Sequence, residues 1–186
     1  MGAGSLTVRS PSGRTAALQT GSASVTGTGA VSGVAGSVFE MANNSTLTGI
    51  TASITPIGGN GTATVSVNGV SGVTISNNTL SASATGNTAT PIYVRSGASN
   101  VTISGNTLSA TGAVGQTVVG GVILDNSSNI VFSNNAVSAT GGNNRSVYLN
   151  NATVLSGTGN RRNSETCELS GTNTGSISFT DSSTCP

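Results

Sequence analysis

A strand–corner–strand unit that recurs along the chain constrains its fold more than any other feature. Three ten-residue segments align without gaps at offsets of 28 and 29 residues: 73–82 (VTISNNTLSA), 101–110 (VTISGNTLSA) and 130–139 (IVFSNNAVSA). In each segment apolar and polar residues alternate over four positions, an Asn-bearing corner follows, and the alternation resumes. This pattern predicts two short strands joined by a bend.

A second set of short apolar strands lies between these segments. Its members begin 25 to 30 residues apart, at residues 38–40, 65–67, 92–94, 122–124 and 147–149. The unequal spacing is absorbed by Gly- and Thr-bearing stretches, which we expect to be loops of variable length. A period of this length, with about three short strands and no run of helix formers, predicts an all-β fold: a parallel β-helix, or solenoid, of about six to seven rungs.

The repeat also predicts how the chain is divided. We expect a single domain in which residues 38–155 form regular rungs. Residues 1–37 are expected to form an irregular N-terminal rung or cap, and residues 156–186 a C-terminal cap. Solenoids need such caps because an uncovered end exposes both core and unpaired strand edges.

Composition fits a solenoid and excludes several kinds of chemistry. Ser, Thr, Gly and Asn make up 105 of the 186 residues, as suits a thin core with many corners. The chain has no His and no Lys, which excludes histidine metal sites, Ser-His-Asp triads and Schiff-base lysines. We therefore expect no metal and no cofactor. The net charge of +1 without a basic run argues against nucleic-acid binding, and no apolar run is long enough to span a membrane.

Both cysteines lie in the last twenty residues, at Cys167 and Cys185. An even pair in a chain rich in Ser, Thr and Asn favours a disulfide, and hence a secreted or cell-surface protein. The alternative is two unrelated buried thiols. The N-terminus lacks the basic and apolar regions of a signal peptide, so any export signal would have been removed or would lie outside this chain.

One asparagine recurs at the corner of each aligned segment: Asn78, Asn106 and Asn135. Neighbouring rungs lie about 4.8 Å apart, so equivalent residues of a corner come into contact. These three side chains are therefore expected to form a ladder of hydrogen-bonded amides. The alternative is three independent turns.

The Ser-Asn-Asn and Ser-Gly-Asn corners between alternating strands resemble those of the right-handed parallel β-helix family, the pectin-lyase-like fold, over roughly residues 60 to 155. A narrower pairing, Gly120-Gly121-Val122-Ile123 followed by Phe132-Ser133-Asn134-Asn135, resembles the surface-exposed passengers of polymorphic adhesins or autotransporters. The resemblance implies an architecture but no single activity, because this fold hosts lyases, hydrolases, epimerases, tailspikes and noncatalytic adhesins.

The outward face of the second strand set is the candidate site. If Ile92 points inward, then Tyr93 and Arg95 point outward, and Asp125 and Tyr148 fall in the same two columns. In enzymes that the chain resembles, this face forms the polysaccharide groove, so we expect a glycan-binding stripe there. The alternatives are tyrosines that stack on each other and an exposed ion pair between Arg95 and Asp125. The same alignment places Glu40 in an inward column, which suggests that it marks the end of the regular core.

The leading hypothesis is a noncatalytic secreted or cell-surface β-helix, adhesin-like or a structural stalk, whose partner is a polysaccharide or host-surface glycan. An alternative is a small polysaccharide lyase or glycoside hydrolase, although a single carboxylate at the stripe lacks the second group that acid–base catalysis needs. A third is a fragment of a larger secreted protein. Thr-x-Thr pairs, such as Thr62 with Thr64, do not recur at one rung position, so they do not predict a regular hydroxyl lattice.

Overall fold

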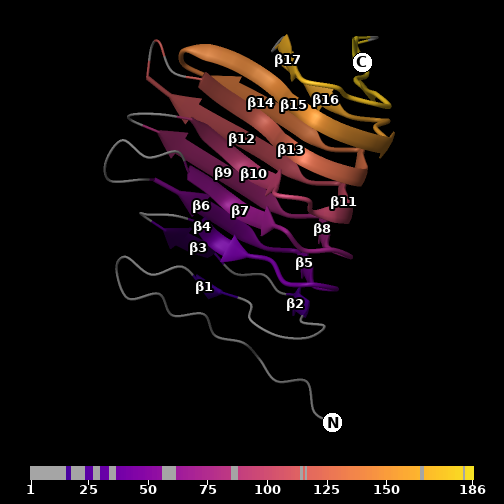
Figure 1. Cartoon of the computed structure of the whole chain (residues 1–186). Coiled ribbons are helices and arrows are strands. Elements are labelled where there is room, and N and C mark those ends of the chain that lie inside the picture. Colours follow the sequence, from indigo (N-terminus) through magenta and orange to yellow (C-terminus); the bar gives the residue numbers. More distant parts are fainter. Residues whose placement is uncertain are drawn as a thin grey trace.

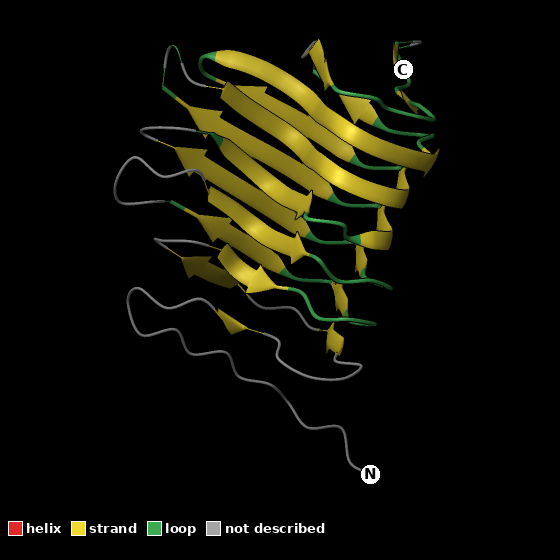
Figure 2. Cartoon of the chain, in the orientation of Figure 1, coloured by secondary structure: helices red, strands yellow, loops and turns green. Residues whose placement is uncertain are grey.

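A computed structural model describes residues 16–17, 24–26, 30–33, 37–55, 62–84, 88–113, 115, 117–163, 166–181 and 183–186. All regular elements among these residues are β-strands, and none of the described residues is helical (Figure 2). No helix that could span a membrane occurs in the described part of the chain. The expectation of an all-β fold is therefore confirmed.

The strands follow one another around a coil, and each turn contributes three strand segments. In the first half they are β1 (Ala16–Ala17), β2 (Ser24–Thr26), β3 (Ala30–Gly33), β4 (Ser37–Glu40), β5 (Thr46–Thr48), β6 (Thr51–Ile54), β7 (Thr62–Asn68), β8 (Thr74–Ser76) and β9 (Thr79–Ala84). In the second half they are β10 (Ala89–Arg95), β11 (Ser99–Ser104), β12 (Thr107–Gly112), β13 (Thr117–Ser133), β14 (Ala136–Thr140), β15 (Asn143–Ser156), β16 (Arg161–Arg162), β17 (Thr166–Ser170), β18 (Ile177–Ser178) and β19 (Thr184–Cys185).

Each strand pairs in parallel with its equivalents one turn before and one turn after, so the turns stack along one axis (Figure 1). One sheet runs β1-β4-β7-β10-β13 and returns through β11-β8-β5-β2, because the long strand β13 spans two sides of the coil. The long strand β15 pairs with β13 and extends this sheet to β17. A second sheet, β16-β14-β12-β9-β6-β3, forms the third side.

The regular solenoid has about four turns, so the expected six to seven rungs are a small overstatement. Four turns have a segment of at least three residues on all three sides; these are β4–β6, β7–β9, β10–β12 and β13–β14. Beyond them the three-sided pattern survives only in part, with the two-residue strands β1 and β16. The strands β1, β2 and β3 nonetheless pair in register with β4, β5 and β6, so sheet pairing continues into the expected N-terminal cap.

The core is a narrow column of apolar, mostly aliphatic side chains. Successive turns place one large apolar residue over another, as in the fully buried stack of Leu47, Ile75, Ile103 and Phe132 on the side formed by β5, β8, β11 and β13. Their alternation with polar residues along each strand is what directs them inward. Few apolar residues are needed because each turn contributes only a few to the core.

The three asparagines expected at the ladder corner are buried and joined by hydrogen bonds. Asn78 Nδ2 donates to Asn106 Oδ1 at 3.0 Å, and Asn106 Nδ2 donates to Asn135 Oδ1 at 3.0 Å. Each Oδ1 also accepts the backbone N–H of the asparagine one turn before. Asn160 extends the ladder by one turn, accepting from Asn135 Nδ2 at 3.2 Å. At the other end Ile50 takes the equivalent place, and only its backbone N–H bonds to Asn78 Oδ1.

The residue before each ladder position adopts a left-handed backbone conformation, and glycine and asparagine alternate there from turn to turn. The five residues are Gly49, Asn77, Gly105, Asn134 and Gly159, with φ between 55° and 72°. A Cβ on Gly105 would lie 2.5 Å from Asn77 Oδ1, and a Cβ on Gly159 would lie 2.2 Å from Asn134 Oδ1. Each asparagine side chain therefore occupies space that the following glycine leaves open.

The register at the start of the regular region differs from the predicted one by a single residue. Phe39, not Val38, pairs with Val65, and Glu40 pairs with Ser66. Phe39 is consequently buried and Glu40 is exposed, so the prediction of an inward Glu40 was wrong. A one-residue slip reverses the face of every side chain in a strand.

The sequence Gly120-Gly121, singled out above as part of a surface-protein motif, has a packing role. A Cβ on Gly120 would lie 2.3 Å from the carbonyl oxygen of Ser138, and one on Gly121 would lie 2.5 Å from that of Ser146. The pairing of β13 with β10 and β15 shifts register next to these residues. Glycine is therefore required by the close approach of neighbouring backbones.

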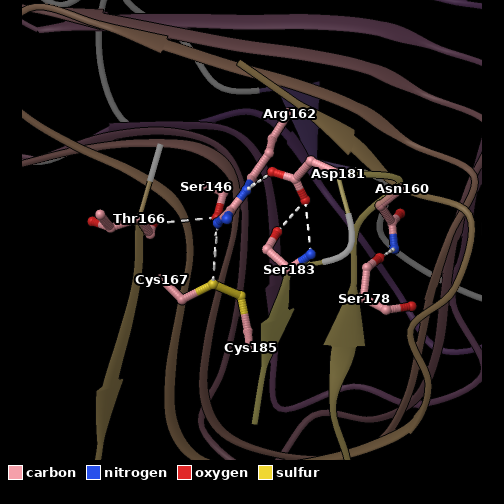
Figure 3. Close-up of polar contacts among 9 residues, drawn as sticks. All are labelled: Ser146, Asn160, Arg162, Thr166, Cys167, Ser178, Asp181, Ser183 and Cys185. Carbon is pink, nitrogen blue, oxygen red and sulfur yellow. Dashed lines mark hydrogen bonds and ion pairs between the residues drawn. A yellow bond between two sulfur atoms is a disulfide. The ribbon is translucent and has the colours of Figure 1, made fainter. Parts of the chain in front are cut away.

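The C-terminal residues fold over the last turn as the short antiparallel pair β18–β19. The buried side chains of this region are Ile177, Phe179 and Cys185. Cys185 forms a disulfide with Cys167 on β17. Figure 3 shows Arg162 reaching Asp181 beside this disulfide, with Arg162 Nε 3.0 Å from Asp181 Oδ2. The bridge and the ion pair both connect the antiparallel pair to the end of the parallel stack.

Candidate functional site

A groove of about 560 Å³ lies on the outward face of β4, β7, β10, β13, β15 and β17. Its central column contains one outward side chain from each strand, in the order Glu40, Ser66, Tyr93, Ile123, Tyr148 and Glu168. The neighbouring residues of the groove are small, including Ser37, Ala63, Thr90 and Thr117. The hollow lies over these small residues, beside the larger side chains of the column.

All four residues of the predicted stripe point outward on this face, and three of them line the groove. Tyr93, Arg95 and Tyr148 line it directly. Asp125 lies behind Tyr93, whose hydroxyl donates to Asp125 Oδ2 at 3.3 Å. Asn126 Nδ2 and Asn150 Nδ2 both donate to the other carboxylate oxygen at 2.8 Å. The Asp125 carboxylate therefore orients one tyrosine and two amides at the edge of the groove.

Burial raises the pKa of the Tyr93 phenol above its ordinary value, and the neighbouring Asp125 carboxylate raises it further. The Arg95 guanidinium opposes this shift without cancelling it. Tyr93 is thus a neutral hydrogen-bond donor throughout the physiological pH range. A neutral phenol held by a carboxylate is suited to positioning and binding.

Arg95 packs on Tyr93 and does not pair with Asp125. Its Cζ lies 5.0 Å from the centroid of the Tyr93 ring, which is within cation–π distance. The described part of the chain contains two ion pairs, Arg145 with Glu168 and Arg162 with Asp181, and Arg95 is in neither. A ring contact is therefore found in place of the ion pair that was the alternative interpretation of Arg95 and Asp125. The buried Arg95 Nε has no hydrogen-bond partner.

The two tyrosines are separated by one strand, with Ile123 between them in register. Their positions differ by two strand spacings, or about 10 Å along the solenoid axis. The two tyrosine rings consequently do not stack on each other, so this alternative interpretation of the stripe was wrong. Two rings at this distance with an aliphatic residue between them form an apolar floor.

An acidic residue lies at each end of the groove, and neither was assigned to the site from the sequence. Glu40 was missed because of the one-residue register error described above. Glu168 lies in the same outward column, one strand beyond the last aligned segment at 147–149. It pairs with Arg145, whose Nε lies 2.9 Å from Glu168 Oε2. Five strand spacings separate Glu40 from Glu168, about 24 Å along the axis.

The acidic residues around the groove are widely spaced along the sheet. Asp125 and Glu168 are two strands and two residues apart, which separates their Cα atoms by on the order of 12 Å. Paired catalytic carboxylates are typically about 5 to 10 Å apart. Among the described residues no group of three or more Asp, Glu, His or Cys side chains is placed to hold a metal ion.

Comparison with known proteins agrees with this architecture. The family model described as "right handed beta helix region" matches residues 23–185, most of the chain. The chain belongs to the right-handed β-helix family. The match covers the expected irregular N-terminal segment from residue 23 onward and the C-terminal region up to residue 185. It therefore extends beyond the 60–155 span over which the corner motifs resemble the family. No curated protein and no solved structure matches the chain.

Proposed function

We propose that this β-helix protein is a noncatalytic, secreted or cell-surface module that binds a glycan in the groove over Tyr93 and Tyr148. The observation that carries the proposal is the placement of both tyrosines of the chain on the floor of one groove. Sugar rings offer apolar faces bordered by hydroxyls. Tyrosine rings match the faces, and a rim of hydroxyl, amide and charged groups matches the hydroxyls.

The groove runs along the solenoid axis and crosses six strands, which suits a chain of sugars more than a single ring. Ile123 lies between the tyrosines, while Arg95 and Glu168 supply polar contacts at its side and end. The strands beneath are fixed by sheet hydrogen bonds, so little conformational entropy is lost on binding. An extended glycan fragment is therefore the ligand that the shape favours.

Two features support binding in preference to turnover. The Asp125 carboxylate accepts three hydrogen bonds, and the nearest acidic residue on this face, Glu168, is two strands and two residues away. The disulfide between Cys167 and Cys185 supports an oxidising compartment, as a secreted or surface protein would experience.

A glycan array probed with the wild-type chain tests the proposal, with the double variant Tyr93→Ala/Tyr148→Ala as the comparison. We expect binding to at least one oligosaccharide class and its loss in the double variant. Thr74→Ala, on the outward face of β8 away from the groove, is the matched control and is expected to bind like wild type. Unchanged binding by the double variant would refute the groove. Degradation of an acidic polysaccharide that disappears in Asp125→Ala would instead establish the lyase or hydrolase alternative.

A further inference from the structure

β17 is the terminal strand of the sheet that bears the groove, and it is held on one side only (Figure 1). In the described part of the chain it pairs with β15 along one edge, so its other edge is open. Leu169 pairs with Leu149 and continues a buried core column, yet its side chain is 44 % exposed because no described strand covers it. A strand with a free edge and an uncovered core residue is the part of a sheet that opens most readily.

The disulfide is the covalent link between this strand and the C-terminal antiparallel pair. Cys167 lies on β17, and Cys185 lies on β19, where its side chain is fully buried. The next residue of β17, Glu168, points to the opposite face, lines the end of the groove and pairs with Arg145. The bridge on the inner side of β17 therefore tethers the strand that places Glu168 at the groove.

The surroundings of Cys167 Sγ are polar, unlike those of an inert buried cysteine. Figure 3 shows Arg162 and Ser146 beside it, with Arg162 Nη1 3.7 Å and Ser146 Oγ 3.6 Å from the sulfur. Asp181 binds the same guanidinium through Nε, which leaves Nη1 free to donate to the sulfur. Cys167 is half-buried and Cys185 is fully buried, so Cys167 is the sulfur that a dissolved thiol can reach.

Reduction by a small thiol proceeds in two exchange steps. The thiolate of one thiol molecule attacks Cys167 Sγ, the bond between the protein sulfurs breaks, and Cys185 leaves as a thiolate that takes up a proton. A second thiolate attacks the small-molecule sulfur of this mixed disulfide, and Cys167 leaves as a thiolate next to the Arg162 guanidinium. The bridge gains two electrons, and two thiol molecules are oxidised to one disulfide. A cation beside a sulfur stabilises its thiolate, so Arg162 favours the reduced form.

We propose that the bridge between Cys167 and Cys185 is a redox switch for the groove. With the bridge closed, β17 is docked on β15 and Glu168 completes one end of the groove. When small thiols open the bridge, β17 separates from β15 and the groove loses this end. The effect on glycan affinity rests on the proposed function, whereas the opening of β17 does not depend on any ligand.

Hydrogen–deuterium exchange of the full chain, followed by mass spectrometry, tests the opening of β17 without a glycan. After complete reduction with dithiothreitol, we expect the exchange of residues 166–170 to become about tenfold faster, because the strand loses its tether. β10 is paired on both edges, so its exchange is the internal control and is expected to stay unchanged. Equal exchange of residues 166–170 in the oxidised and reduced chains would overturn the proposal.

Equilibration of the folded chain with glutathione buffers tests the role of Arg162. Arg162→Gln is expected to lower the equilibrium constant for reduction by about tenfold, and Arg162→Lys, which keeps the charge, to lower it less. Arg161→Gln alters the neighbouring exposed side chain, so it is the matched control and is expected to behave like the wild type. Circular dichroism verifies that the variants are folded. An equal effect of Arg161→Gln and Arg162→Gln, or no effect of either, would contradict the role of the guanidinium.

The glycan array connects the switch to binding. An oligosaccharide that binds the oxidised wild type is expected to bind the reduced chain severalfold more weakly. The double variant Cys167→Ala/Cys185→Ala is expected to bind as weakly as the reduced chain, with or without reductant. Equal affinity of the oxidised and reduced chains would refute a switch of the groove. If no oligosaccharide binds either form, the proposed function is wrong, and the exchange of residues 166–170 alone decides whether the bridge controls β17.

Discussion

Replacement of Asn106 by alanine should destabilise the solenoid strongly, because this residue has an asparagine neighbour on both sides in the buried amide ladder. Its Nδ2 donates to Ile75 O and to Asn135 Oδ1, both at 3.0 Å. Its Oδ1 accepts from Asn78 N at 2.9 Å and from Asn78 Nδ2 at 3.0 Å. The side chain is 1 % exposed, so water does not replace these four bonds in the variant.

The magnitude follows from those four bonds. Each contributes about 0.5 to 1.5 kcal/mol net, which gives roughly 4 kcal/mol for the set. Because the buried N–H of Asn78 also loses its acceptor, we do not expect a loss below this central value. For a chain of this size, such a loss lowers the melting temperature by roughly 8 to 16 °C.

The assay is chemical denaturation of Asn106→Ala and of Asn143→Ala, followed by circular dichroism. Asn143 is exposed at the start of β15, and its replacement is expected to change the free energy of unfolding by less than about 0.5 kcal/mol. The denaturant midpoint should fall in Asn106→Ala while the m-value stays unchanged. Equal stability of the two variants would refute the stabilising role of the ladder.

Three further predictions concern packing and the C-terminal region. Gly120→Ala should lower the free energy of unfolding in urea by about 3 kcal/mol, because its new Cβ would lie 2.3 Å from a backbone carbonyl oxygen of β14. A variant as stable as the wild type would contradict this close approach. Reduction of the disulfide between Cys167 and Cys185, which are 18 residues apart, should lower the free energy of unfolding by roughly 3 kcal/mol. The melting temperature of the wild type should therefore fall when reductant is added, whereas reductant should not change that of the double variant Cys167→Ala/Cys185→Ala. Hydrogen bonds from Ser183 and from the Arg162 guanidinium lower the pKa of Asp181 to about 2. The contribution of these bonds to the stability of the folded chain is therefore fully present above about pH 4 and is lost as the pH falls through about 2. Melting curves across this range should show a smaller acid effect in Asp181→Asn, and an identical acid effect would disprove the contribution of Asp181.

The sequence predicted the architecture well where its repeat is nearly exact. The segments at 73–82, 101–110 and 130–139 pair in the structure at the offsets by which they were aligned. Each Asn corner fixes the register of the strands on both sides of it, so the alternation of inward and outward residues follows directly. The outward direction of Tyr93 and Arg95 could be predicted for the same reason.

The prediction was less accurate where no corner motif fixes the register. Before β7 the alignment relied on matching Val38 with Val65, and the structure pairs Phe39 with Val65. The preference of a large aromatic residue for the core and of a glutamate for solvent would have indicated the correct register. This single error removed Glu40 from the predicted groove.

The other end of the groove was missed for a related reason. Thr158-Gly159-Asn160 has the form of the Ser104-Gly105-Asn106 corner, and Asn160 does join the ladder. Recognition of this corner would have extended the register past residue 155 and toward Glu168. The contacts of Arg95 and Asp125 could not be predicted at all, because a column of outward residues does not determine which neighbours their side chains choose.

The alternation of glycine and asparagine at the left-handed corner sets a rule for changes in the length of the chain. Deleting the turn that carries Gly105 would place Asn77 directly against Asn134, two residues that each need a glycine as the next neighbour. Deleting or duplicating two consecutive turns would preserve the order. The structural repeat of this protein is one turn, but the unit that can be gained or lost without disturbing this corner is a pair of turns.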